Sequence, residues 1–271
     1  MNSSTTSTRS HGVVIKVGEL TVNLQTMDAD YCQELRNHYY GFVVAAGRAE
    51  FNFHIELIDS GTSDREDDVR VTRRSAVWTF GRGDFHAECN MASKLGTIRQ
   101  SANLYSIDAA LRIFHTIMLA SRGGFLLHSA SAIRNGKAYL FAGPSGVGKT
   151  TIASLAPIDA TLLTDEVSYV RKCAEGFAAF GTPFAGELAK FGENVSAPIA
   201  GLYLLEQGSA NRSEPIRASD SVRAVLANIL FFAEDHELVR SVFRCACQFV
   251  NCVPVYRLTF LPDFRVWEHV G

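Results

Sequence analysis

The sequence predicts an α/β protein with a β-rich N-terminal part over residues 13–105 and a larger α/β domain over residues 106–271. Short apolar runs alternate with polar breaks as far as Asn103, which is typical of strands and loops. From Ser106 the apolar residues recur at helical spacing instead. Farther along, an apolar strand pattern, a glycine-rich loop and a helical pattern follow one another between residues 138 and 156. That order predicts a strand, loop and helix unit in the second part.

The composition is typical of a globular protein, because 47% of the 271 residues are hydrophobic and 20% are charged. The formal net charge of -2, without any basic run, argues against a nucleic-acid-binding protein. No window is long and apolar enough to span a membrane, and the Ser/Thr-rich segment Met1–Gly12 lacks the apolar stretch of a signal peptide. We therefore expect a cytoplasmic protein with a disordered tail over residues 1–12, and neither a nucleic acid nor a membrane as partner.

The N-terminal part carries no motif that indicates a function. The six cysteines of the chain lack the paired spacing of a zinc site, and a cytosolic protein would keep them reduced. Cys245 and Cys247 are expected to pack as small hydrophobic residues on a helix. The strands predicted for the N-terminal part are Val13–Val17, Gly41–Ala45, Phe51–Ile58, Val69–Val71 and Ala76–Phe80.

A helix opens the second part. Ser106 is a good N-cap residue, the apolar positions from Ile107 to Met118 follow at helical spacing, and Gly123-Gly124 supplies the stop. The elements predicted near the C-terminus are a buried strand at Ala200–Leu205, helices at Asp220–Phe232 and Glu237–Val250 with Phe231, Phe232, Phe243 and Phe249 in the core, and a strand at Val255–Phe260.

A hairpin follows the first helix, with strands at residues 126–133 and 137–142. Asn135-Gly136 joins them, and this dipeptide is favoured in two-residue type I′ turns because both positions need positive φ. Counting outward from the turn eventually places His128 opposite Gly143. The register therefore predicts that His128 lies beside the first glycine of the next loop.

That loop, Gly143–Thr150, matches G-x-x-x-x-G-K-[ST] in full, a pattern expected by chance about once in a hundred chains of this length. In such loops the glycines let backbone N–H groups approach phosphate oxygens, a lysine such as Lys149 reaches the β- and γ-phosphates, and the last hydroxyl, here Thr150, binds Mg²⁺. The following helix adds its N-terminal dipole. The alternative is a glycine-rich turn without a ligand. We expect ATP and Mg²⁺ as cofactors, bound by Gly143, Pro144, Ser145, Gly146, Val147, Gly148, Lys149, Thr150 and Thr151.

Two carboxylates, Asp165 and Glu166, stand at the C-terminal end of the next predicted strand, Ala160–Thr164. Metal ligands and bases are found at such strand ends beside phosphate loops. We expect Asp165 to hold Mg²⁺ together with Thr150, and Glu166 to take the proton from an attacking hydroxyl. The alternative is that both are solvated charges at a turn. His128 has two interpretations as well, a phosphate contact, which the register favours, or a structural hydrogen bond.

The run Leu127-His128-Ser129-Ala130, the loop Gly143–Thr150 and the pair Asp165-Glu166 together resemble the catalytic core of HPr serine kinase and of the HPr kinase-related proteins that share a core with phosphoenolpyruvate carboxykinase. The resemblance covers residues 128–166. It implies a P-loop kinase core of the HPr kinase C-terminal type. It also implies that His128 lies near the transferred phosphate, Lys149 binds the phosphates, Asp165 works with the metal and Glu166 is the general base. Glu166 replaces the family's usual aspartate.

The sequence gives less information about the molecule that accepts the phosphoryl group. The downstream signature of HPr kinase, around Glu-Ile-Arg-Gly, is absent, and Gly181–Glu187 stands in the corresponding region. This segment is similar to HPr kinase-like proteins associated with peptide natural-product maturation, which implies a peptide serine as acceptor. Glu187 and Arg212 are candidates for the substrate pocket, and the alternative for each is a surface role.

The sequence therefore predicts a kinase that transfers the γ-phosphoryl group of ATP to a serine hydroxyl of a protein or peptide. Two alternatives stay open, a small-metabolite kinase or carboxykinase-like enzyme and a nucleotide-binding module without catalysis. A homo-oligomer also stays open.

Overall fold

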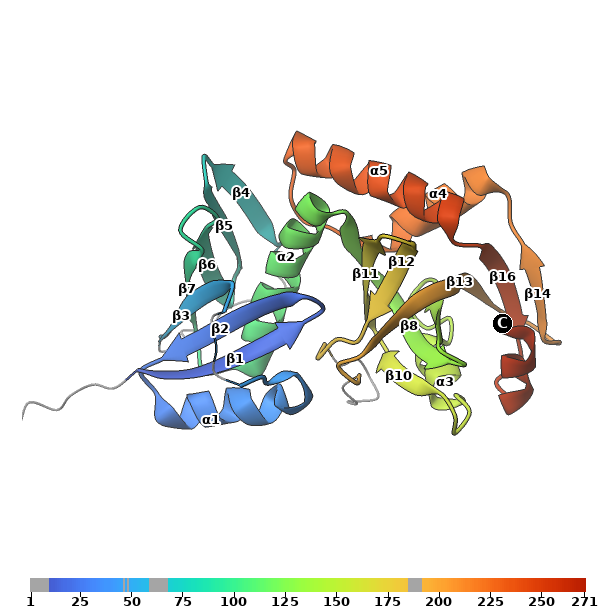
Figure 1. The fold of residues 1–271 in the computed structure, drawn as a ribbon, viewed down its shortest axis with the longest axis horizontal. Coiled ribbons are helices and arrows are strands. Elements are labelled where there is room, and N and C mark those ends of the chain that lie inside the picture. The colour runs from blue at the N-terminus through green and yellow to red at the C-terminus, as the bar shows by residue number, and fades with distance from the viewer. Residues whose placement is uncertain (1–9, 46, 48, 59–67, 185–191) are drawn as a thin grey trace, which may run out of the picture. The chain divides into compact units, whose positions relative to one another are not determined.

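The computed structural model describes residues 10–45, 47, 49–58, 68–184 and 192–271. The chain divides into two compact units, Met1–Leu111 and Arg112–Gly271. Each unit has its own mixed β-sheet and its own helices, so the architecture is α/β (Figure 1).

The first unit is built on strands β1 (His11–Val17), β2 (Leu20–Thr26), β3 (Phe51–Leu57), β4 (Arg70–Arg74), β5 (Val77–Arg82), β6 (Phe85–Asn90) and β7 (Leu95–Gln100). Within the described residues they form one sheet in the order β1-β2-β3-β7-β6-β5-β4. Buried and partly exposed residues alternate along β2, where Leu20, Val22 and Leu24 are buried. This period of two places one face of the sheet on the core and the other toward water.

Several expectations for the first unit are wrong. β1 begins at His11, inside the tail expected over residues 1–12. The strand expected at Gly41–Ala45 is instead the 3₁₀ helix η1 (Tyr40–Phe42) followed by an isolated bridge. The sequence also does not predict the helix α1 (Ala29–His38), because its buried side chains are only Tyr31, Cys32 and Leu35 and its periodicity is weak.

The helix α2 (Leu104–Arg122) starts earlier than expected. The side-chain oxygen of Asn103 accepts a hydrogen bond from the backbone N–H of Tyr105 at 2.8 Å. Ser106, the expected N-cap, is buried inside the helix and donates its hydroxyl to Asp84 at 2.9 Å. The end of the helix is as predicted, because Gly123 follows Arg122 with φ of 75°.

The second unit contains the last turns of α2, from Arg112 onward, and the larger sheet. Its further elements are β8 (Gly124–Arg134), β9 (Lys137–Ala142), α3 (Lys149–Ser154), β10 (Thr161–Thr164), β11 (Val167–Cys173), β12 (Gly176–Phe180), β13 (Ser196–Gln207), β14 (Arg212–Pro215), α4 (Ala218–Asn228), β15 (Ile229–Leu230), α5 (His236–Cys252), β16 (Val255–Phe260) and η2 (Phe264–His269). The described strands run in the order β10-β8-β11-β12-β13-β16-β14, while β9 pairs with β8 and β13, and β15 pairs with β8.

The predicted hairpin is formed by β8 and β9. Asn135 and Gly136 have φ of 51° and 71°, which confirms a turn with two left-handed residues. The register is confirmed from Arg134 opposite Lys137 as far as Ser129 opposite Ala142. The next expected pair, His128 with Gly143, does not form. The ladder with β9 ends at Ser129, and His128 pairs with Val167 of β11 on the opposite edge of β8.

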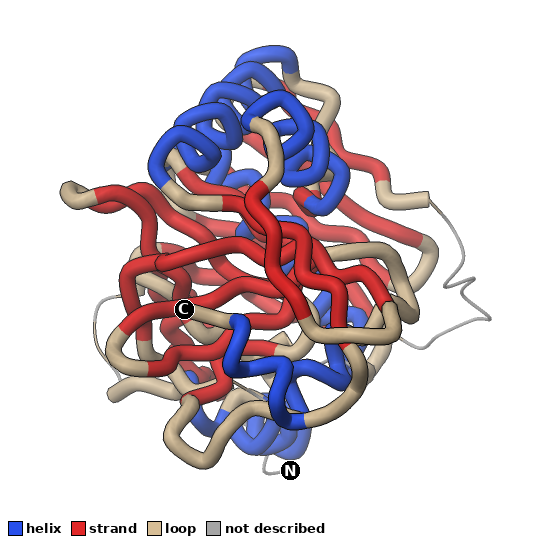
Figure 2. The backbone as a smooth tube through the Cα atoms, turned by 90° about the vertical axis from the view of Figure 1, so that its right-hand side faces the viewer, coloured by secondary structure: helices blue, strands red, loops and turns tan. Residues whose placement is uncertain are grey.

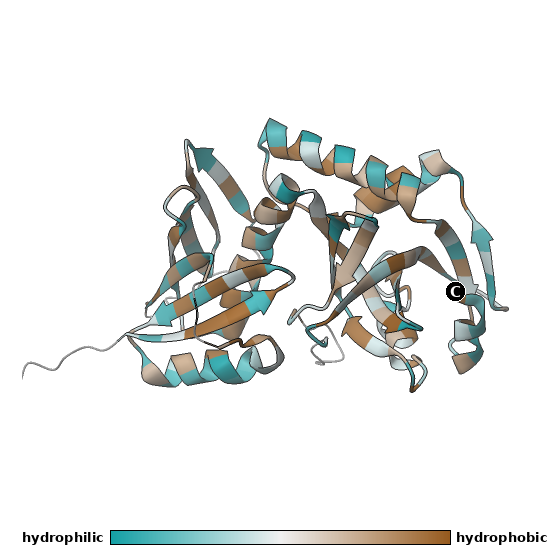
Figure 3. Cartoon of the chain, in the orientation of Figure 1, coloured by the Kyte–Doolittle hydropathy of each residue, from teal (hydrophilic) through white to brown (hydrophobic). Residues whose placement is uncertain are grey.

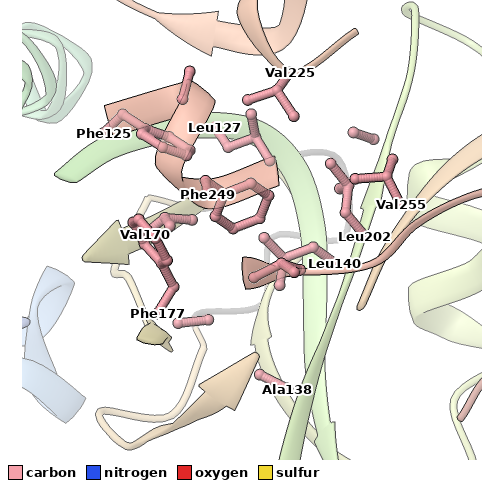
Figure 4. Close-up of a cluster of buried hydrophobic side chains, with 14 of the residues drawn as sticks. Phe125, Leu127, Ala138, Leu140, Val170, Phe177, Leu202, Val225, Phe249 and Val255 are labelled. Atoms are coloured by element: carbon pink, nitrogen blue, oxygen red, sulfur yellow. The ribbon is translucent and has the colours of Figure 1, made fainter. Parts of the chain in front are cut away.

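The core of the second unit lies on both faces of the sheet. On one face Leu127, Leu140 and Leu202 pack with Val225 of α4 and Phe249 of α5 (Figure 4). Figure 1 shows α4 and α5 together on that side, with α3 on the other, and Figure 2 shows helices above the strands of the sheet. The apolar stripe of α5 shows as brown bands between hydrophilic ones in Figure 3. The other face holds a second cluster, in which Ala130, Phe141, Ile152, Phe260 and Trp267 are buried.

The C-terminal helices differ from expectation at their ends. α4 stops at Asn228, and the next two residues pair with β8 as β15. Of the phenylalanines expected in the core, Phe249 is fully buried, but Phe243 is 53% exposed, so that prediction was wrong. Phe243 lies on the outer side of α5, where helical spacing alone does not separate it from the buried stripe.

Candidate functional site

The glycine-rich loop between β9 and α3 has a backbone that requires glycine. Gly143, Gly146 and Gly148 have φ of 153°, 76° and 115°. A Cβ atom added to Gly148 would lie 2.5 Å from Cζ of Phe260. The turn is therefore tight against the sheet, and its conformation is not available to ordinary L-residues.

Lys149 holds the loop from inside. Its side chain is buried, with 8% of the residue exposed, and its Nζ donates hydrogen bonds to the carbonyl oxygens of Gly143 at 2.9 Å and Pro144 at 3.1 Å. From β13, Gln207 donates to the carbonyl oxygens of Gly146 and Val147 at 3.3 and 3.4 Å. These carbonyl groups are thus engaged by side chains on the protein side of the loop.

The short helix α3 starts at Lys149, and no side chain caps its first turn. Its first backbone N–H groups have no partners within the helix. Thr150 and Thr151 stand in this turn and are partly buried. Trp267 fixes the helix to the C-terminal 3₁₀ helix, because its indole N–H donates to the carbonyl oxygen of Ile152 at 3.2 Å.

The acidic pair forms a bend between β10 and β11. The hydroxyl oxygen of Thr164 accepts hydrogen bonds from the backbone N–H groups of Glu166 at 3.2 Å and Val167 at 3.1 Å. Thr164 is paired with Ser131 of β8, and Val167 is paired with His128 of the same strand. Asp165 is 2% exposed, and the side chain of Glu166 is 32% exposed. The bend is therefore held at both ends by β8, and one of its two carboxylates reaches water.

Arg112 of α2 is a site residue that the sequence reasoning missed. Its two terminal nitrogens lie 3.4 and 3.2 Å from the two carboxylate oxygens of Glu166, an end-on two-point pair. Its guanidinium carbon stands 5.4 Å from the ring centre of Phe184. Arg112 and Glu166 are 54 positions apart in the sequence. No motif or periodicity connects them, so only the fold could reveal the pair.

His128 brings the loop and the acidic pair together. It pairs with Val167, directly after the acidic bend, and its neighbour Ser129 pairs with Ala142, directly before the loop. Burial lowers the pKa of His128, and the positive charge of Lys149 lowers it further, while Glu166 opposes the shift. The charges of both the loop and the bend therefore act on this ring. Because its pKa is lowered, the imidazole is neutral at neutral pH.

A cluster of three buried serines links β8 to β11. Ser129 donates its hydroxyl to that of Ser168 at 2.8 Å. The Ser168 hydroxyl is also 2.9 Å from the Ser131 hydroxyl and 3.0 Å from the Ser129 carbonyl oxygen. Thr182 donates to the carbonyl oxygen of Val167 at 2.9 Å. Side-chain hydrogen bonds thus add to the backbone ladder between β8 and β11 on the core side of the site.

His115 lies deeper on α2, fully buried among the rings of Phe114, Tyr169 and Phe184. Neither ring nitrogen has a hydrogen-bond partner among the residues that the structure describes. Burial lowers the pKa of this imidazole to about 3, and the charge of Arg122 adds to the effect. The folded protein therefore keeps His115 neutral well below its ordinary pKa of about 6.5.

The burial of His115 predicts that the folded protein loses stability at acidic pH. Below about pH 6.5 the unfolded chain binds a proton at His115 that the folded chain does not, so the free energy of unfolding falls as the pH drops, by up to about 1.4 kcal/mol per pH unit from this residue. Urea unfolding at neutral and at mildly acidic pH measures the slope. His115→Leu should flatten it. His86→Leu, at a side chain that is 56% exposed, is the control and should leave the slope unchanged. An unchanged slope in His115→Leu would show that other groups cause the acid sensitivity.

Of the two expected substrate residues, the structure describes Arg212 alone. Glu187 lies outside the described residues. Arg212 is on the edge strand β14, where its side chain is 64% exposed and pairs with Glu214 at 3.7 Å. Among the described residues no group of three or more His, Cys, Asp or Glu side chains can hold a metal ion. None of the described helices has the length and apolar character needed to cross a membrane.

Comparison with known proteins identifies the family. Residues 95–271 match the family described as SynChlorMet cassette protein ScmC. The chain belongs to this family. The match includes the glycine-rich loop, the acidic bend, Arg112 and His128 of this ScmC-family chain.

Other comparisons are more distant. No curated protein matches the chain. Among solved structures, the Hpr(Ser) kinase/phosphatase from Coxiella burnetii is similar at 12% sequence identity and a TM-score of 0.25, over 44% of this chain and 87% of that chain. A TM-score of 0.25 is too low to establish a shared fold.

Proposed function

We propose that this ScmC-family protein is a kinase that transfers the γ-phosphoryl group of Mg²⁺-ATP to a serine hydroxyl of a protein or peptide. One observation carries the proposal. Ser129 and His128 of β8 are paired with the residue directly before the glycine-rich loop and with the residue directly after the acidic bend, so that the loop and the carboxylate pair flank His128 on the two edges of β8.

The loop supplies the phosphate site. Its glycines have the left-handed conformations that allow close backbone approach, and the first turn of α3 offers backbone N–H groups that have no acceptor within the helix. Lys149 is already held against the loop and adds a positive charge for the β- and γ-phosphates. Neutral His128 adds a hydrogen-bonding group without a charge of its own.

The donor groups fit a magnesium ion. Mg²⁺ prefers oxygen ligands, and the Thr150 hydroxyl and the buried Asp165 carboxylate are oxygen donors of the kinds it takes. Bound there with the nucleotide, it would neutralise negative charge on the phosphates.

Glu166 would act on the acceptor. Its carboxylate takes the proton of the serine hydroxyl as the serine oxygen forms a bond to the γ-phosphorus. The bond between that phosphorus and the β,γ-bridging oxygen breaks, and ADP leaves with the bond electrons. Because Glu166 reaches solvent while Asp165 is buried, the two carboxylates are suited to different roles.

Titration calorimetry with ATP in the presence of Mg²⁺ tests this function. ATP should bind and AMP should bind far more weakly, because the loop contacts phosphates that AMP lacks. Mass spectrometry then detects phosphate on serine-containing peptides. Equal affinity for ATP and AMP, or no binding of either, would refute the nucleotide site. Binding without transfer to any hydroxyl would favour a nucleotide-binding module without catalysis.

A further inference from the structure

In the structure, the carboxylate that the proposed function uses as a base, that of Glu166, is paired with Arg112. Both oxygens of Glu166 lie against the guanidinium, at 3.4 and 3.2 Å. In this arrangement one lone pair of each oxygen faces the guanidinium, so a serine hydroxyl would have to share the carboxylate with Arg112.

The pair is loose enough to be exchanged. Charge-assisted N–H···O bonds are usually about 2.7–2.9 Å long, shorter than both contacts here. The side chains of Arg112 and Glu166 are 25% and 32% exposed. By contrast, Arg82 holds Asp84 through two contacts of 2.6 Å, and the side chain of Asp84 is only 1% exposed. A partly hydrated pair with long contacts costs little to separate.

Arg112 is suited to a phosphoryl group. A guanidinium binds phosphate through two parallel N–H donors, as it does a carboxylate. The contact with the Phe184 ring supports the guanidinium independently of Glu166, so the side chain has a second anchor when the carboxylate moves. Besides burial, the positive charges of Lys149 and Arg112 both lower the pKa of His128. A phosphate bound in this part of the site would be attracted by both cations.

We propose that Arg112 exchanges Glu166 for the γ-phosphate when ATP binds, and that this exchange frees the Glu166 carboxylate to accept the serine proton. The inference rests on the proposed function, because it assigns a role within the same site. The exchange separates the Glu166 carboxylate from Arg112 only when a triphosphate is bound. Arg112 is then a phosphate-binding residue in the loaded protein and a partner of Glu166 in the free protein.

The ratio of ATP affinity to ADP affinity tests the exchange without any transfer assay. Calorimetry is done with Mg²⁺, ADP and a non-hydrolysable ATP analogue. Arg112→Ala should lower the ratio about tenfold or more, because a charge-assisted contact to the γ-phosphate is lost while ADP makes no such contact. Glu166→Gln should raise the ratio about two- to fivefold, because the competing carboxylate is removed. The matched control Arg122→Ala, at an exposed arginine of the same helix, should keep the parental ratio.

The double variant separates exchange from simple repulsion. If Glu166 acts by competing for Arg112, Glu166→Gln changes nothing further in the Arg112→Ala background. An equal rise in both backgrounds would mean that Glu166 only repels the phosphate, and the exchange would be wrong. Glu166→Gln leaves the Arg112 side chain in place. The rise in the affinity ratio expected for this single variant therefore tests the exchange even when Arg112→Ala lowers the stability of the protein. If the parent binds neither nucleotide, the proposed function fails; if it binds both and Arg112→Ala leaves the ratio unchanged, only the exchange fails.

Discussion

Lys149→Ala is expected to lower ATP affinity by about 10²-fold or more while the protein stays folded. The ammonium group is buried beneath the loop and donates to two of its carbonyl oxygens. The substitution removes a charge from the phosphate site and also removes the bridge that fixes the loop. Both changes weaken phosphate binding, and neither removes a side chain from the hydrophobic clusters.

Calorimetry with Mg²⁺-ATP measures the loss, and thermal unfolding checks the fold. The matched control is Lys172→Ala, because Lys172 is exposed on β11 and its side chain donates to Gln248 at 3.0 Å, away from the loop. This variant should bind ATP as the parent does. ATP binding by Lys149→Ala with parental affinity would rule out the loop as the phosphate site.

Glu166→Gln is expected to lower phosphoryl transfer by about 10² to 10⁴, the usual contribution of a general base. The amide keeps the shape of the side chain but cannot take the serine proton. Nucleotide binding should persist, because the loop and Asp165 are unchanged. A transfer assay with a serine peptide, beside nucleotide calorimetry, measures both quantities. Transfer at the parental rate would show that the base lies elsewhere.

Asp165→Asn separates the two carboxylates. A neutral amide oxygen replaces a charged ligand, so the variant should need a higher Mg²⁺ concentration for nucleotide binding. Magnesium titrations of nucleotide affinity for Asp165→Asn, Glu166→Gln and the parent measure this. If the magnesium dependence shifts in Glu166→Gln and not in Asp165→Asn, the proposed roles of the two carboxylates are exchanged.

The local parts of the site could be predicted from the sequence. Positive φ at Asn135 and Gly136 follows from the turn chemistry, and the turn sets the hairpin register outward to Ser129. The glycine-rich loop is one continuous segment and the acidic pair is another, so each can be recognised in the sequence alone. In each case the signal is carried by residues within a few positions of one another.

The parts that depend on long-range contacts could not be predicted. Arg112 shows only as a polar position on an apolar helix, and its pairing with Glu166 depends on how α2 lies on the second sheet. The end of the β8–β9 ladder at Ser129 was also missed, because counting from the turn assumes that this ladder continues to His128. The pairing of His128 with Val167 lies on the other edge of β8, about which the turn gives no information.

Strand β8 sets the distance between the glycine-rich loop and the carboxylates. The two are tied to opposite edges of β8 at neighbouring residues, so their backbones are two strand spacings apart, about 10 Å, with an offset of about 3.3 Å along the strand. That spacing is a property of extended backbone and does not depend on which apolar side chains fill the core. Substitutions in the two hydrophobic clusters can therefore change the stability of the fold without altering the separation of the loop and the acidic bend. An insertion or deletion of one residue in β8 would alter that separation at once, and would also turn the imidazole of His128 to the other face of the sheet.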